Sequence, residues 1–216
     1  MESKLKKLAA STNITQEELW EVAQRDSAYA EIVAHNTAAG SDLLRKIYVL
    51  LSEVDSPISA ACSVLGNPNV DIGFITEIFK EFEDIFEDRD VDYPEQTSFQ
   101  VLLSKHQNVS SEIIEALWDS PYYMVRERLA ARTDLPAKIA EKLAKDGSRH
   151  VREILAGNKY VTDEVLNILV SDIEPSIRLK LALNPMTSSV AIRQLMEDSN
   201  KTIRFAAETR QASSVE

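Results

Sequence analysis

Apolar residues recur along this chain with a period of about 26 residues. A β-branched residue followed by arginine appears four times at that spacing, as Val125-Arg126, Val151-Arg152, Ile177-Arg178 and Ile203-Arg204. With the Val or Ile counted as position 0, leucine stands at position 4 in several repeats, and further apolar residues stand at positions 14, 15 and 18. A fixed internal period of this length is typical of repeat architectures.

The spacing within each repeat is helical and not alternating. It predicts a short helix A of about two turns around positions 0 and 4, and a helix B of about three turns around positions 14 to 18. Helices this short cannot bury their apolar stripe alone, so they must stack on neighbouring repeats. The pattern therefore predicts an all-α fold, an α-solenoid of paired helices.

The same register extends over the whole chain, which we interpret as one α-solenoid domain, 1–216. In the first repeat the predicted apolar positions are Leu8, Leu19 and Val22. The interpretation gives about seven two-helix repeats and a terminal helix, with the approximate bounds 4–28, 29–59, 60–98, 99–124, 125–150, 151–176, 177–202 and 203–210.

The predicted turns contain residues that end and begin helices. Asparagine stands at position 7, where helix A should end, and we expect it there because it tolerates the left-handed backbone conformation. These asparagines are Asn36, Asn67, Asn158 and Asn184. Hydroxyl side chains that can cap helix B follow four of the turns, and they are Thr15, Ser110, Thr162 and Ser188. Thr15 and Glu18 also have the spacing of a capping box.

One segment, 80–98, interrupts the register. The apolar pattern continues from Phe79 to Phe86, which predicts a longer helix B, and the segment 80–98 as a whole is an acidic insert with a net charge of −6. The acidic residues are Glu81, Glu83, Asp84, Glu87, Asp88, Asp90, Asp92 and Glu95. The insert is either a solvated loop or a surface that binds a protein with a basic face. A calcium loop is disfavoured because Tyr93 and Phe99 replace the Gly and Glu that such loops need.

An aspartate precedes each arginine of the repeat. Asp146, Asp172 and Asp198 stand six residues before Arg152, Arg178 and Arg204, and Asp119 stands seven residues before Arg126. We interpret these residues as a structural ladder, in which Asp joins Arg across the turn, since Arg pairs well with carboxylates. The alternative is an exposed arginine row that binds an anion.

Charge is distributed unevenly along the chain. The net charge is −11 overall, and the first 124 residues contribute 22 acidic and 9 basic side chains, or −13. This acidic half disfavours binding to a phosphate backbone and favours a partner with a basic face. No apolar run approaches the roughly 20 residues of a membrane-spanning helix. The single cysteine, Cys62, predicts no internal disulfide and a reducing cytoplasm, and we expect it to be a small buried apolar residue.

Four basic residues, Lys138, Lys142, Lys145 and Arg149, are spaced by four, three and four residues and therefore share one helix face. They resemble the basic face of HEAT-like solenoids that bind DNA. However, acidic residues interrupt the set and no aromatic neighbour is evident in the sequence, so we interpret it as a solvated face.

The sequence contains no recognisable catalytic motif. His35, His106 and His150 are scattered, and there is no glycine-rich phosphate loop or nucleophile elbow. Trp20 and Trp118 lie in predicted helices B, where packing against neighbouring helices is the simplest role. We therefore expect no catalytic residues, no metal and no cofactor.

The repeat resembles the leucine-rich repeat variant (LRV) family of bacterial α-solenoids, with HEAT-like repeats as close neighbours. The resemblance rests on Leu143-Ala144-Lys145-Asp146, on Val151-Arg152 with Leu155-Ala156, and on Ile177-Arg178 with Leu181-Ala182 and Asn184-Pro185. It covers about 99–209 well and the preceding part less well. It implies a right-handed superhelix. A founding member of that family holds an iron–sulfur cluster with cysteines, and the lone Cys62 cannot provide that ligand set.

Taken together, these features favour a non-catalytic, cytoplasmic repeat scaffold for protein–protein interaction. Such solenoids offer an extended surface made of one face of every repeat. The first alternative is a HEAT-like nucleic-acid-binding protein, and the second is an enzyme with its site in the concave groove. The identity of the partner and the oligomeric state do not follow from the sequence.

Overall fold

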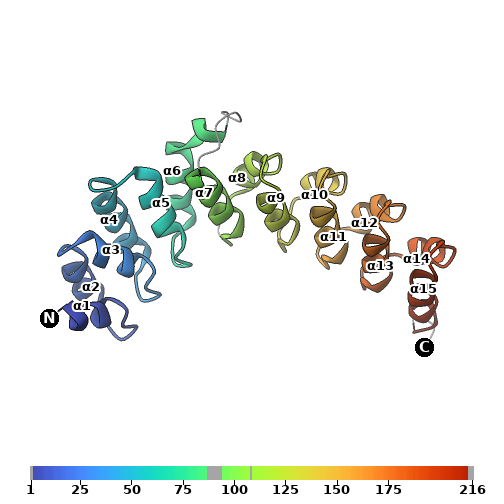
Figure 1. Cartoon of the computed structure of the whole chain (residues 1–216), viewed down its shortest axis with the longest axis horizontal. Coiled ribbons are helices and arrows are strands. Elements are labelled where there is room, and N and C mark those ends of the chain that lie inside the picture. Colours follow the sequence, from blue (N-terminus) through green and yellow to red (C-terminus); the bar gives the residue numbers. More distant parts are fainter. Residues whose placement is uncertain (1, 87–93, 108, 214–216) are drawn as a thin grey trace. The chain divides into compact units, whose positions relative to one another are not determined.

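The structure is a computed structural model that describes residues 2–86, 94–107 and 109–213 (Figure 1). Within these residues the chain forms fifteen α-helices and one short 3-10 helix, η1, with no strand. The helices are α1 (Glu2–Ala9), α2 (Gln16–Ala23), α3 (Ser27–Ala34), α4 (Ser41–Ser52), α5 (Pro57–Leu65), α6 (Ile72–Glu81), η1 (Glu83–Phe86), α7 (Pro94–Lys105), α8 (Ser111–Leu117), α9 (Tyr123–Ala130), α10 (Ala137–Leu143), α11 (Arg149–Gly157), α12 (Asp163–Leu169), α13 (Pro175–Leu183), α14 (Ser189–Leu195) and α15 (Lys201–Ser213). The predicted all-α fold is therefore confirmed.

The chain divides into two compact units, 1–113 and 114–216, and the boundary lies inside α8. In unit 1 the odd-numbered helices α1, α3, α5 and α7 pack side by side as a layer of helices A (Figure 1). In unit 2 the helices α9, α11, α13 and α15 do the same, and α10, α12 and α14 form the layer of helices B. Each unit is thus a stack of helical pairs, as in an α-solenoid.

Burial follows the predicted register. In unit 2 the residues at positions 0 and 4 of helices A are at most 1% exposed, and Leu155 and Leu181 are both fully buried. Positions 14, 15 and 18 of helices B are also buried, with Ile139 and Ile192 at 2%. The apolar stripes of the two layers therefore face each other and form a strip of core that lengthens with each repeat.

The predicted length of helix B, about three turns, is wrong in unit 2, whereas the two turns predicted for helix A agree with α9, α11 and α13. Helices B contain seven residues there, whereas helices α9, α11 and α13 contain eight or nine. Helix B ends early because its last apolar residue is followed at once by a tight turn, as where Asp146 N–H donates to the Leu143 carbonyl. An apolar pattern marks the buried face of a helix but does not mark where the helix ends.

The first repeat departs from the prediction at one position. Leu8 is 38% exposed, and its neighbour Ala9 is fully buried instead. Helix α1 packs mainly against α2 and α3, so part of its surface stays open. The predicted capping box of Thr15 and Glu18 is confirmed, and Ser110 and Ser188 accept backbone N–H groups. The cap predicted at Thr162 is wrong, since its side chain accepts no such bond.

The conformation predicted for the position-7 asparagines is also wrong. No non-glycine residue of the described chain has a positive φ. Asn158 and Asn184 end their helices with ordinary extended angles, with ψ of 125° and 120°. Their role in the turn must therefore come from the side chain.

The acidic insert is partly helical. Helix α6 ends at Glu81, and the separate helix η1 follows it, so the predicted continuous long helix B is broken at Phe82. Helix α7 begins at Pro94, so the last residues of the predicted insert belong to the next helix A. Residues 87–93 lie outside the described part of the chain.

The shared burial of Leu155 and Leu181 generates a test of the register. Each side chain is 0% exposed, so truncation to alanine should remove about 2–5 kcal/mol of unfolding free energy by leaving a cavity. Urea denaturation of Leu155→Ala and Leu181→Ala would measure it. A mild effect at both positions would contradict the assigned core.

Candidate functional site

The position-7 asparagines form an asparagine ladder, by which we mean Asn36, Asn67, Asn158 and Asn184. Each of the four is at most 8% exposed. Each side-chain Nδ2 donates to two backbone carbonyls of the preceding repeat, and each Oδ1 accepts the N–H of the residue two positions later. The amide thus pairs two carbonyls of the preceding repeat and one N–H of its own repeat.

Asn184 illustrates this geometry. Its Nδ2 lies 2.7 Å from the Ala156 carbonyl oxygen and 3.0 Å from that of Asn158. Both carbonyls belong to the end of α11, where helix carbonyls lack N–H partners of their own. The period of asparagine in the sequence signalled the position, but the partners are 26 and 28 residues away and are visible only in the fold.

A second set of contacts joins the arginine and aspartate columns. Nε and Nη2 of Arg152 lie 2.6 and 3.1 Å from the two carboxylate oxygens of Asp172. The pair Arg178–Asp198 has the same distances. Each arginine also donates from Nη1 to the carbonyl six residues earlier, as Arg152 does to Asp146 at 2.7 Å. The guanidinium therefore connects the turn before its helix A to the turn after its helix B.

This geometry corrects the predicted pairing. The carboxylate bound by each arginine comes 20 residues later, at the end of helix B, and the aspartate six residues earlier contributes its backbone oxygen. Arg126 pairs with Asp146 and donates to the carbonyl of Ser120, so Ser120 and not Asp119 holds the equivalent position. Arg204 donates to the carbonyls of Asp198 and Ser199, and no described residue offers it a carboxylate.

The acidic residues of the insert do not form a common site among the described side chains. Glu81 accepts a hydrogen bond from the Tyr48 hydroxyl at 2.7 Å. Burial, together with that bond and the charge of Glu81, raises the pKa of Tyr48 above its ordinary value. Glu83 and Asp84 are exposed on η1. The other predicted residues lie outside the described side chains, and they are Glu87, Asp88, Asp90, Asp92 and Glu95.

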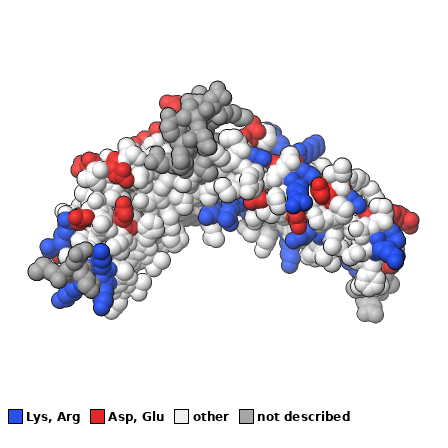
Figure 2. Space-filling view, in the orientation of Figure 1, with Lys and Arg blue, Asp and Glu red and all other residues white. Residues whose placement is uncertain are grey.

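The predicted basic face does not lie on one helix, because Lys138 and Lys142 belong to α10, Lys145 lies in the following turn and Arg149 begins α11. Figure 2 shows Lys and Arg side chains gathered in this region. Lys138 lies 3.7 Å from a carboxylate oxygen of Glu115, and both side chains are exposed. The Lys142 ammonium lies 3.9 Å from the ring centre of Trp118, which corrects the expectation that no aromatic residue accompanies this set.

The remaining candidates are separated from one another. His35 contacts the Glu31 carbonyl, whereas His150 lies beside Tyr123 in unit 2. Cys62 is half-buried, so the expectation of a fully buried residue is wrong. No cluster of metal-ligating side chains is found among the described residues. None of the described helices has the length and apolar character needed to cross a membrane.

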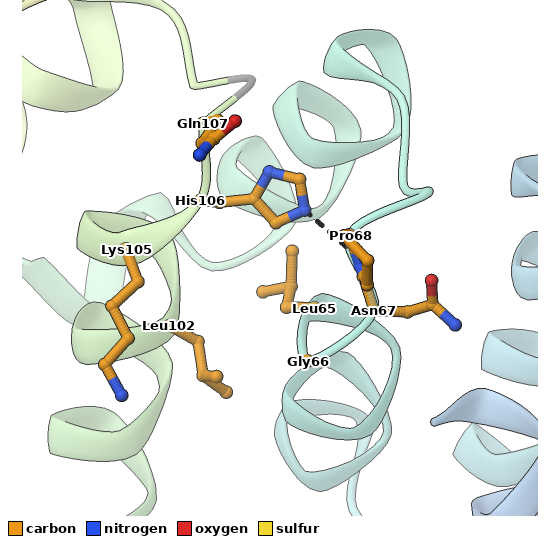
Figure 3. A pocket seen from close by; sticks show the side chains of 8 residues that line it. All are labelled: Leu65, Gly66, Asn67, Pro68, Leu102, Lys105, His106 and Gln107. Carbon is orange, nitrogen blue, oxygen red and sulfur yellow. Dashed lines mark hydrogen bonds between the residues drawn. The ribbon is translucent and has the colours of Figure 1, made fainter. Parts of the chain in front are cut away.

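A pocket of about 440 Å³ opens between the ends of α5 and α7 in unit 1 (Figure 3). Its lining consists of Leu65, Gly66, Asn67, Pro68, Leu102, Lys105, His106 and Gln107. His106 is 8% exposed and occupies position 7 of its repeat, where other repeats have asparagine. The sequence analysis groups it with scattered histidines, but its place in the 26-residue register is the signal that relates it to the asparagine ladder.

Comparison with known proteins finds no matching family model, no matching curated protein and no matching solved structure.

The arginine contacts generate a stability test. Replacing Arg152 by alanine should lower the unfolding free energy by about 2–3 kcal/mol, because it leaves the largely buried Asp172 carboxylate without its cation. Arg204→Ala is the matched control, since Arg204 makes the backbone contacts without a carboxylate. Thermal unfolding should show the larger loss for Arg152→Ala, and equal losses would contradict a stabilising role for the ion pair.

The same pair predicts how this difference depends on pH. Burial alone would raise the pKa of Asp172, but the Arg152 guanidinium and the Glu174 N–H hold it below its ordinary value of 3.8. A lowered folded-state pKa stabilises the protein above the unfolded value, and the effect is lost as pH falls through the folded value. The melting-temperature gap between wild type and Arg152→Ala should therefore narrow below about pH 4.

Proposed function

We propose that this chain is a non-catalytic, cytoplasmic repeat scaffold that binds a protein partner. The supporting observation is an exposed apolar surface on the layer of helices A in unit 2. Leu183 on α13 is 65% exposed and Phe205 on α15 is 70% exposed, although the two helices pack side by side. Clustered exposed apolar residues are typical of protein-interaction surfaces.

The register places these side chains on equivalent faces of neighbouring helices A. Leu179 and Leu183 are four residues apart on one face of α13, and Leu179 and Phe205 both stand two positions after the Val or Ile of their repeats. We refer to Leu179, Leu183 and Phe205 as the apolar surface. A face of helices A is the kind of extended surface that stacked repeats offer to partners.

We further propose that the repeats form one right-handed superhelix of about seven repeats and that the chain is related to the LRV solenoids. The support is the recurrence of identical contacts at the 26-residue period, as in the two arginine pairs with equal distances. Such recurrence is expected when each repeat adopts the same conformation and stacks in the same way.

A nucleic-acid partner is the second candidate, and one observation favours it. Trp118 lies beside the basic face of α10, and aromatic rings next to basic residues can stack on exposed bases. The acidic neighbours Glu115 and Glu141 and the overall charge of −11 oppose it. We therefore rank it below a protein partner.

A paired substitution tests the proposed surface. Leu183→Ser with Phe205→Ser should reduce capture of specific partner proteins from a host lysate by about tenfold, since interface anchors carry much of the binding energy. Ile173→Ser is the matched control, because Ile173 is 83% exposed but lies in a turn. Equal capture by all three proteins would contradict the proposal, and recovery of nucleic acid in place of protein would favour the second candidate.

A further inference from the structure

Each asparagine of the ladder binds the same pair of backbone carbonyls, and we call the side chain together with these two carbonyls a rung. They are the carbonyls at positions 5 and 7 of the preceding helix A, as for Asn67 with Ala34 at 2.8 Å and Asn36 at 2.8 Å. Asn158 repeats this with the carbonyls of Ala130 and Arg132. The chain itself thus shows that a primary amide fits this place between two helices A.

His106 stands at the next rung after Asn67 and contacts one of the two expected carbonyls. Its Nε2 lies 3.2 Å from the Asn67 carbonyl oxygen, so Nε2 carries the hydrogen that is donated (Figure 3). The other expected acceptor is the carbonyl of Leu65, the last residue of α5. The Leu65 carbonyl stands at position 5 of its repeat, as does the Ala34 carbonyl that Asn67 binds.

Among the described residues, no donor reaches the Leu65 carbonyl. Pro68, three residues later, has no N–H, and the Asn69 N–H donates to the side chain of Asn67 at 3.0 Å. Leu65 is only 2% exposed. A buried carbonyl without a donor costs free energy unless some other molecule supplies a hydrogen bond.

The pocket of about 440 Å³ lies at this place. Figure 3 shows Leu65 and Leu102 on its apolar side, with Lys105 and Gln107 at its edge. Its volume falls within the range of small-ligand sites, and its lining combines apolar side chains with a few polar groups. The Leu65 carbonyl that lacks a donor, which makes this rung an open rung, therefore lies at the pocket.

We propose that this pocket binds a primary carboxamide on a short apolar stem. The amide NH₂ donates to the Leu65 carbonyl, and the amide oxygen accepts from the Lys105 ammonium. The stem packs against Leu65 and Leu102. Lys105 disfavours a cationic ligand by repulsion, and a carboxylate has no N–H for the Leu65 carbonyl. An asparagine or glutamine side chain of a polypeptide and a free small amide share this chemistry.

The variant His106→Asn tests whether the pocket is available because the Leu65 carbonyl lacks a donor, since an asparagine there would bind both carbonyls of the rung. By analogy with Asn67, the new amide should bind the carbonyls of Leu65 and Asn67 and fill the place of the ligand. We therefore expect the variant to fold, to melt at a higher temperature than the wild type, and to lose carboxamide binding. His35→Asn is the matched control, because His35 does not line this pocket.

The experiment titrates butyramide, butyrate and butylamine into the full chain and follows the methyl signals of Leu65 and Leu102 by NMR. Butyramide should bind about tenfold more tightly than either comparison compound, which is the effect of roughly one hydrogen bond. His106→Asn should remove the butyramide response, and His35→Asn should keep it. Lys105→Met should weaken butyramide binding.

Equal responses to the three compounds, or an unchanged butyramide response in His106→Asn, would overturn the proposal. A further titration with N-acetylglutamine N-methylamide separates the two sources of the amide. Binding at least as tight as that of butyramide assigns the pocket to a polypeptide side chain, and weaker binding assigns it to a free amide. The pocket lies in unit 1, so its test is independent of the apolar surface on α13 and α15.

Discussion

Helices of seven to nine residues end with carbonyl groups that have no N–H partner within the helix, and in stacked repeats the next repeat covers these ends. In the four repeats that contain it, the asparagine ladder solves this problem with a single side chain, because a primary amide can donate two hydrogen bonds. These hydrogen bonds form only when the preceding repeat is folded against the asparagine. Pairing of the helix ends is therefore coupled to stacking, and the repeats stabilise one another through polar as well as apolar contacts.

The arginine and aspartate columns serve the other turn of each repeat in unit 2. Arg152 and Arg178 each combine a bidentate carboxylate contact with a backbone carbonyl contact, which positions helix A relative to the turns on both sides. The polar residues that recur every 26 positions are thus occupied by internal contacts. Binding functions must therefore come from positions that differ between repeats, such as the exposed Leu183 and Phe205.

Three repeats replace the position-7 asparagine with a larger side chain. His106 contacts the Asn67 carbonyl, Arg132 binds Asp134, and Arg210 donates to the carbonyls of Pro185 and Thr187. These side chains are longer or more rigid than asparagine and bind other partners. At His106 one of the two expected carbonyls lacks a donor, and a pocket lies beside it. The replacement of asparagine by histidine at one position thus creates a site that the repeats with asparagine do not have.

The sequence alone determined the all-helical fold and most of the core, because apolar periodicity is a local property and Leu155 and Leu181 stand at equivalent positions. It also located the asparagine, arginine and aspartate columns. Only the tertiary structure decided their partners. The Asp172 carboxylate pairs with Arg152, and Arg178 reaches only the Asp172 backbone carbonyl, because helix B returns the chain to the start of its own helix A. The asparagines act through side-chain bonds across repeats, and the pocket at His106 depends on the carbonyl of a helix 41 residues away. Contacts between distant segments require the stacked geometry, which a local pattern does not contain.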